Sequence, residues 1–157
     1  MAQFLGTYQN KLDAKGRVSI PAPFRSVLKL MSSVGEGSLV APLVLRPSHQ
    51  YPCIEAWTQK GFEALSAPLE AYSQFSQQHA DLAIGLFGDA FGIETDREGR
   101  IILSADLVAH ANIGETVSFI GASNTFEIWE PAAGALRLAE AKAAIRAANL
   151  TLRTVSS

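Results

Sequence analysis

The sequence predicts an α+β protein, richer in strands than in helices, in which two similar units form one compact body. One observation is a strand–turn–strand–helix–hairpin pattern that occurs twice along the 157 residues. Another is the size of each unit, because roughly 45 residues bury little apolar surface alone and two such units should pack together. We therefore expect internal pseudo-two-fold symmetry.

The repeat is visible in two pairs of motifs. LDAKGRVSIPA at 12–22 aligns with TDREGRIILSA at 95–105, an offset of 83 residues. CIEAW at 53–57 aligns with FEIW at 126–129, an offset of 72 residues. The difference means that the first copy carries 11 extra residues between its motifs. The serines and glycines near 30–38 favour an exposed loop there.

Each copy begins with a strand that leads into Asp-x-x-Gly-Arg. Glycine tolerates positive φ and aspartate bonds nearby backbone N–H groups, so this motif is typical of a tight turn. A short strand follows, expected at 17–20 and at 100–103. A helix then begins, for which Pro21 suits an early position in the first copy and Ser104 is the expected N-cap in the second.

Each unit is expected to continue with a helix and to end with a second pair of strands. One apolar helical face is predicted from the i, i+3, i+4 and i+7 spacing of Phe24, Val27, Leu28 and Met31. The closing strands are expected at 39–45 with 53–57, and at 116–121 with 125–129. The turn GASN at 121–124 joins the last pair as a hairpin.

Two helical regions lie outside the repeats. Residues 58–87 read as a helix, a break near 66–68 and a second helix. One face of this region is expected to carry Tyr72, Phe75, His79, Leu82 and Leu86. An alanine-rich helix is expected at 131–150, starting at Pro131. Its docking onto the body is assigned to Leu136, Leu138, Ala141 and Ile145, and the tail 151–157 carries no strong signal.

These boundaries divide the chain into four parts. Residues 7–56 and 86–129 are the expected repeated domains, 57–85 a helical linker, and 130–157 the C-terminal helix and tail. The apolar fraction of 48% can supply a core. Neither a secretory signal nor a membrane-spanning apolar run is visible, and we expect a cytoplasmic protein.

Charge is distributed unevenly along the chain. The net charge is −2, yet residues 1–31 carry +4 and the remainder therefore −6. A localised basic face matters more for phosphate binding than the overall charge does. Four basic side chains crowd around the first turn: Lys11, Lys15, Arg17 and Arg25.

No enzyme chemistry is predicted. The histidines His49, His79 and His110 are isolated and lack metal-ligand spacing. Cys53 is the single cysteine, which excludes an internal disulfide, and it suits a small core residue. The recurring carboxylates and tryptophans are interpreted as structural partners and packing residues: Glu55, Glu127, Trp57 and Trp129. We expect no catalytic residue, no metal and no cofactor.

The segment YQNKLDAKGRVSIPAPFR, together with the second TDREGRIILSADL, closely resembles the MraZ family of bacterial transcriptional regulators, and the match covers nearly the whole chain. The resemblance implies two SpoVT/AbrB-type swapped-hairpin DNA-binding units and a ring-shaped homo-oligomer. It also implies binding to direct repeats in the promoter of the division and cell-wall gene cluster, with repression of the protein's own operon at the nucleoid. The family's Asp-x-x-x-Arg motifs map to Asp13 with Arg17 and to Asp96 with Arg100.

Chemistry suggests a role for each residue of the first motif. The planar fork of Arg17 can bond guanine O6 and N7 together in the major groove. Lys11 and Lys15 suit phosphates, which position a protein without reading sequence. Arg25 suits a phosphate or Asp13, and Asp13 is expected to orient Arg17 or to close the turn.

The second motif predicts a weaker DNA surface. Arg97 and Arg100 stand against Asp96, Glu98 and Asp106, and Val108 replaces Arg25. Its role is expected to be mainly assembly.

Three alternatives stay open at this point. In one, each Asp–Arg pair merely pins its turn. In another, the chain is an antitoxin-like module that binds a partner protein as well as DNA, with the helix at 131–150 as the partner-binding element. In the third, it is a purely structural ring.

Overall fold

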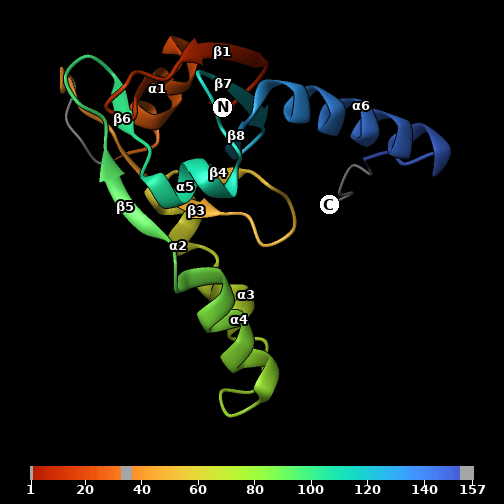
Figure 1. The fold of residues 1–157 in the computed structure, drawn as a ribbon. Coiled ribbons are helices and arrows are strands. Elements are labelled where there is room, and N and C mark those ends of the chain that lie inside the picture. Colours follow the sequence, from red (N-terminus) through yellow and green to blue (C-terminus); the bar gives the residue numbers. More distant parts are fainter. Residues whose placement is uncertain (1, 33–36, 153–157) are drawn as a thin grey trace.

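The computed structural model describes residues 2–32 and 37–152, and Figure 1 shows their fold. A six-stranded antiparallel sheet has the order β1-β7-β8-β4-β3-β5, and β2 pairs with β6 in a separate two-stranded ribbon. The strands of the large sheet are β1 (Thr7–Lys11), β7 (Thr116–Ala122), β8 (Thr125–Trp129), β4 (Ile54–Trp57), β3 (Pro42–Pro47) and β5 (Phe91–Glu94). The ribbon strands are β2 (Arg17–Ser19) and β6 (Arg100–Ile102).

The two repeats exchange their first strands, which confirms the predicted pseudo-two-fold symmetry and the α+β fold class. β1 of the first repeat pairs with β7 of the second, and β5 of the second pairs with β3 of the first. Equivalent residues face each other on the axis, where Val18 lies opposite Ile101 and Glu55 opposite Glu127. Neither repeat therefore completes its sheet without the other.

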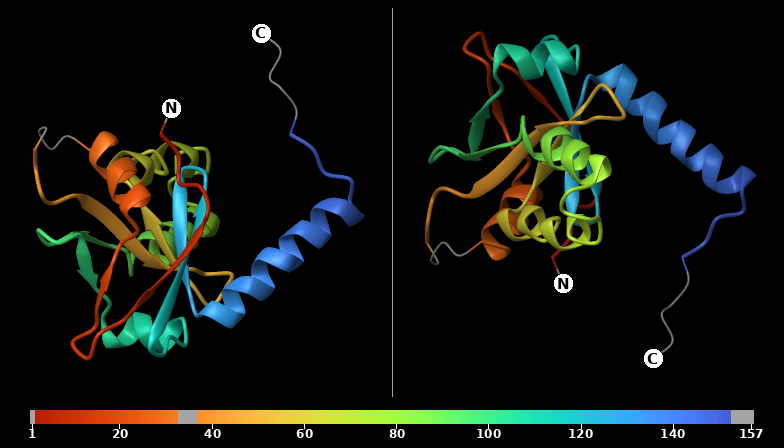
Figure 2. Two further views of the ribbon diagram at one scale, coloured as in Figure 1. Left: turned by 90° about the horizontal axis from the view of Figure 1, so that it is seen from above. Right: turned by 90° about the horizontal axis from the view of Figure 1, so that it is seen from below.

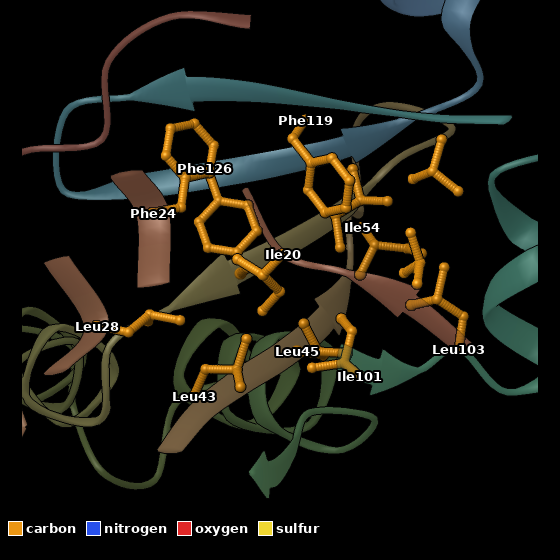
Figure 3. Close-up of a cluster of buried hydrophobic side chains, with 14 of the residues drawn as sticks. Ile20, Phe24, Leu28, Leu43, Leu45, Ile54, Ile101, Leu103, Phe119 and Phe126 are labelled. Carbon is orange, nitrogen blue, oxygen red and sulfur yellow. The ribbon is translucent and has the colours of Figure 1, made fainter. Parts of the chain in front are cut away.

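The core lies between the inner face of the sheet, the ribbon and two helices, α1 (Ala22–Leu30) and α5 (Ala105–His110). Figure 3 shows apolar side chains of the sheet, the ribbon and α1 meeting in this space, and Leu107 of α5 belongs to the same cluster. The ring of Phe24 lies 5.0 Å from that of Phe126 and 5.4 Å from that of Phe4. Each such side chain contributes about 1.5–3 kcal/mol when fully buried.

The first helix follows its predicted pattern with one exception. Phe24, Val27 and Leu28 are buried, whereas Met31 follows the last helical residue and is 40% exposed. Pro21 stands immediately before the helix as its N-cap, one position earlier than expected. Ser104 caps α5 as predicted and accepts a hydrogen bond from the Leu107 N–H at 3.3 Å.

Three helices between the repeats form an arm that extends from the body (Figure 1). They are α2 (Gln59–Glu63), α3 (Ser66–Leu69) and α4 (Gln77–Phe87). The break expected at 66–68 is wrong, because these residues form α3. The expected common face is also wrong at Tyr72 and Phe75, which lie between α3 and α4 and are 47% and 94% exposed. Ser76 starts α4 by accepting the His79 N–H at 3.1 Å.

A buried arginine fastens this arm to the sheet. Arg46 on β3 is 5% exposed and donates to Glu55 at 2.5 Å and to the Leu86 carbonyl of α4 at 3.0 Å. Glu55 also accepts the indole N–H of Trp57 at 3.1 Å. The interpretation of Glu55 as a structural partner is therefore confirmed.

The C-terminal helix α6 (Pro131–Ala147) starts at Pro131 as predicted, but most of it projects from the body (Figure 2). Gly134 is buried against Trp129, whereas Leu136 is 60% exposed and Ile145 49%. The docking expected of this helix is wrong because Leu136 and Leu138, two residues apart, point in different directions around a helix of 3.6 residues per turn.

The remaining differences are small. The ribbon strands each end one residue early, and β3 starts at Pro42 rather than at residue 39. The expected extra loop at 30–38 and the tail at 151–157 fall partly on 33–36 and 153–157, which lie outside the described residues. Across the described ranges, no helix combines the length and the apolar character needed to cross a membrane.

Candidate nucleic-acid interface

The first Asp-x-x-Gly-Arg motif forms a turn organised by one carboxylate. Asp13 Oδ1 accepts the backbone N–H groups of Lys15 and Arg17 at 2.9 and 2.8 Å. Asp13 Oδ2 accepts the side-chain Nε–H of Arg17 at 2.7 Å. Gly16 has a φ of +80°, which favours glycine there. These bonds, chiefly the backbone N–H of Arg17, hold the pKa of Asp13 below its ordinary value.

The second motif repeats this geometry closely. Asp96 Oδ1 accepts the backbone N–H groups of Glu98 and Arg100, both at 2.9 Å, and Asp96 Oδ2 accepts Arg100 Nε–H at 2.8 Å. Gly99 has a φ of +78°. The pKa of Asp96 is lowered for the same main reason, the backbone N–H of Arg100. Each Asp–Arg pair therefore closes its turn, as the turn-pinning alternative requires.

The ribbon brings the two arginines onto one face. Side chains alternate along a strand, and Val18 and Ile101 point into the core, so Arg17 and Arg100 point outward. Arg17 lies opposite Ile102, which makes Arg100 its diagonal neighbour across the ribbon. One surface hollow is lined by both arginines, together with Ile93, Glu94, Thr95, Asp96, Ile101 and Ile102.

The two turns are also tied together through their backbones. The Leu103 N–H donates to the Gly16 carbonyl at 2.8 Å, and the Ile20 N–H donates to the Gly99 carbonyl at 2.9 Å. The position of one turn therefore depends on the ribbon strand of the other repeat. The two arginines form a single surface rather than two separate ones.

The two lysines near the first turn lie on different parts of the chain. Lys15 is exposed on the turn itself. Lys11, at the end of β1, alternates with Asn10, whose side chain donates to the Ser19 carbonyl of the ribbon at 2.7 Å. Lys11 therefore points to the face of β1 opposite the one from which Asn10 reaches the ribbon.

Arg25 has a role that sequence reasoning missed. Its side chain lies against Gly99 of the second turn, and its Nη1 donates to the Ile20 carbonyl at 3.2 Å. Within the described residues it makes no hydrogen bond or ion pair with Asp13, so that expected contact is wrong. A side chain on Gly99 would collide with Arg25, a constraint that only the folded structure reveals.

The two turns differ most in charge. At the 83-residue offset, Glu94 and Glu98 stand where the first copy has Lys11 and Lys15. Glu98 bonds the Nη2 of Arg100 at 2.6 Å, which adds a second carboxylate to this guanidinium. The reversal of charge is visible in the alignment of the two repeats. The Glu98–Arg100 ion pair is not, because it depends on where the two side chains lie.

The remaining chemistry-bearing residues do not assemble into a site. Among the described residues, no group of three or more His, Cys, Asp or Glu side chains could hold a metal ion. Cys53 is buried, and burial, with Glu127 and Glu55 nearby, raises the pKa of its thiol to about 12. Glu127 accepts the Trp129 indole N–H at 2.9 Å, which confirms its structural assignment.

The exchanged strands and the paired Asp–Arg turns define a double-repeat protein of the swapped-hairpin class. The family model described as "MraZ protein, putative antitoxin-like" matches residues 3–83 and again 86–148, so the chain belongs to the MraZ family.

Three curated relatives carry the name Transcriptional regulator MraZ. The protein of Gluconacetobacter diazotrophicus is 54% identical over 90% of this chain and 87% of its own length. That of Gluconobacter oxydans is 48% identical over 100% of this chain and 93% of its own. That of Xanthobacter autotrophicus is 40% identical over 93% and 88%.

Proposed function

We propose that this protein is a sequence-specific DNA-binding regulator of transcription, active in the cytoplasm at the nucleoid. Its target is the promoter of its own division and cell-wall gene cluster, which it represses by binding direct repeats as a ring-shaped homo-oligomer. The names of the relatives, all transcriptional regulators, support the regulatory role.

The first turn carries the proposal. Among the described residues, Asp13 is the hydrogen-bond partner of the Arg17 side chain, and it uses only Nε–H. An arginine side chain has five N–H donors, so the two Nη groups stay available to guanine O6 and N7. Asp13 fixes the direction of the guanidinium and therefore lowers the entropy lost on binding.

The other basic residues surround this contact. Lys15 stands beside Arg17 on the exposed turn and suits the DNA phosphates. Lys11 is assigned to a phosphate farther along the duplex, reached from the edge of the sheet. Arg25 acts mainly by holding the second turn in place. Asp96 and Arg100 lie on the same face as Arg17.

Assembly explains how such a small basic surface could bind tightly. Repeating the first turn around a ring lets neighbouring subunits engage neighbouring DNA repeats. Linking sites in this way raises overall affinity by ~10²–10⁴ without new contacts.

Competition binding tests this function. Wild-type protein is titrated into a labelled fragment from upstream of its own gene, with unlabelled competitor of the same or of shuffled sequence. We expect the shuffled competitor to be at least ~10³ times less effective, as for other specific DNA-binding proteins. Equal competition by both fragments would rule out sequence-specific regulation.

A second candidate function is partner binding by an antitoxin-like module. The projecting helix α6 favours it, because Leu136 and Ile145 are exposed along its length. Co-purification of a small protein that is lost when 135–157 are deleted would support this function, with DNA binding unchanged.

A further inference from the structure

The two turns have the same backbone geometry but hold their arginines differently. Among the described residues, Arg17 of the first turn is bound by Asp13 alone, at 2.7 Å. In the second, Arg100 is bound by Asp96 at 2.8 Å and by Glu98 at 2.6 Å. The position of Glu98 is that of Lys15 in the first repeat.

We propose that Glu98 withholds Arg100 from DNA, so that each subunit reads DNA through its first turn only. This inference rests on the proposed DNA-binding function. A single residue, acidic in one repeat and basic in the other, decides which of two equivalent turns recognises bases.

The two arginines differ in how many of their guanidinium donors face a carboxylate. A guanine contact needs two N–H donors of one arginine in a fixed fork. Within the part of the chain that the structure describes, Nε and Nη2 of Arg100 both pair with carboxylates, whereas Nε alone does so in Arg17. Guanine approaching the Nη groups of Arg100 would therefore meet an Nη2 whose charge is already paired with the Glu98 carboxylate, an ion pair with no counterpart at Arg17 among the described residues.

The electrostatics act in the same direction. The Glu98 side chain is 70% exposed and lies beside the arginine on the outer face. DNA brought to Arg100 would place phosphates near this carboxylate and near Glu94, which lines the same hollow. Lys15 at the equivalent position of the first turn attracts phosphate instead. The charge difference therefore favours the first turn before any base is read.

The shared backbone geometry makes an exchange experiment possible. Glu98→Lys gives the second turn the residue of the first, and Lys15→Glu gives the first turn the residue of the second. Neither changes Asp-x-x-Gly-Arg or a buried side chain. Glu70→Lys, at the exposed C-cap residue that follows α3 on the helical arm, is the control with the same change in net charge.

Binding to the labelled upstream fragment is measured for wild type and for these three variants. Arg100→Ala and the double variant Glu98→Lys/Arg100→Ala are measured in the same way. The mass of the oligomer is determined for each protein. We expect Glu98→Lys to bind about fivefold more tightly, the upper end for releasing an exposed ion pair. Each added phosphate contact should also steepen the logarithmic salt slope by ~0.9. Lys15→Glu should weaken binding.

Arg100→Ala separates a released arginine from a general charge effect. In wild type it should change affinity little, and in the Glu98→Lys background it should remove the gain. An equal gain from Glu70→Lys, or a gain that persists without Arg100, overturns the inference. If wild type binds specifically but Glu98→Lys gains nothing, only this inference fails. If wild type does not bind at all, the proposed function fails with it.

Discussion

Removal of the buried Arg46 side chain should destabilise the protein strongly. Arg46 is 5% exposed, and it neutralises Glu55, whose side chain is 16% exposed, while also donating to the Leu86 carbonyl. Arg46→Met leaves a buried carboxylate without its cation and a helix end without its donor. Breaking such a buried pair costs about 3–5 kcal/mol.

This loss should lower the midpoint of thermal unfolding by roughly 6–20 °C for a chain of this size. Urea denaturation followed by circular dichroism gives the free energy of unfolding directly. The double variant Arg46→Met/Glu55→Gln should recover much of the loss, because no uncompensated charge remains. The exposed Arg97→Met serves as the control and should change stability by less than about 0.5 kcal/mol. A loss below about 1 kcal/mol for Arg46→Met would refute the reasoning.

Three further predictions concern the turns and the core. Gly16→Ala should lower the free energy of unfolding, measured in urea, more than Gly99→Ala does. The methyl group added at Gly16 meets the backbone carbonyl of Leu103 at 2.9 Å, whereas the one added at Gly99 meets the flexible side chain of Arg25. Equal losses of stability in the two variants would contradict this prediction. The pKa values of Asp13 and Asp96 are lowered in the folded protein. The ionised carboxylates therefore stabilise the fold fully above the ordinary pKa of aspartate. This stabilisation is lost as the pH falls through the lowered pKa values of the folded state. The double Asp→Asn variant should therefore show a shallower loss of unfolding free energy between about pH 4 and pH 2, and an unchanged slope would count against the turn geometry. Cys53, with its pKa raised to about 12, should react with a thiol reagent at pH 8 only after unfolding in urea, and rapid reaction of the native protein would show that the thiol is accessible.

Local sequence signals predicted much of the fold. The Asp-x-x-Gly-Arg motif predicts its turn because aspartate and glycine act within five residues. The 83- and 72-residue offsets predict the symmetry, and Val18 opposite Ile101 confirms it. The exchange of β1 and β5 between the repeats was predicted only through the family resemblance. Strands that pair across a hundred residues leave no local signal in the sequence.

The predictions that failed concern short helices and the directions of side chains. Ser66 opens a helix where a proline two residues later suggested a break, since proline is tolerated in a first helical turn. Lys11 was grouped with Arg17 because the two are near in sequence, and the structure places them in different sheets. The bond between Glu98 and Arg100 depends on rotamers, which no sequence pattern specifies.

The central claim is that the first turn is the DNA-reading surface. Its most direct test is titration of the labelled upstream fragment at two salt concentrations with wild type, Arg17→Ala and the matched Arg100→Ala, each with its assembly verified by mass. We expect steep salt dependence for wild type, a loss for Arg17→Ala of about five- to 150-fold from one lost base contact, and near wild-type binding for Arg100→Ala. Wild-type affinity of Arg17→Ala with its assembly intact would contradict the account and leave the Asp13–Arg17 pair as a purely structural closure of its turn.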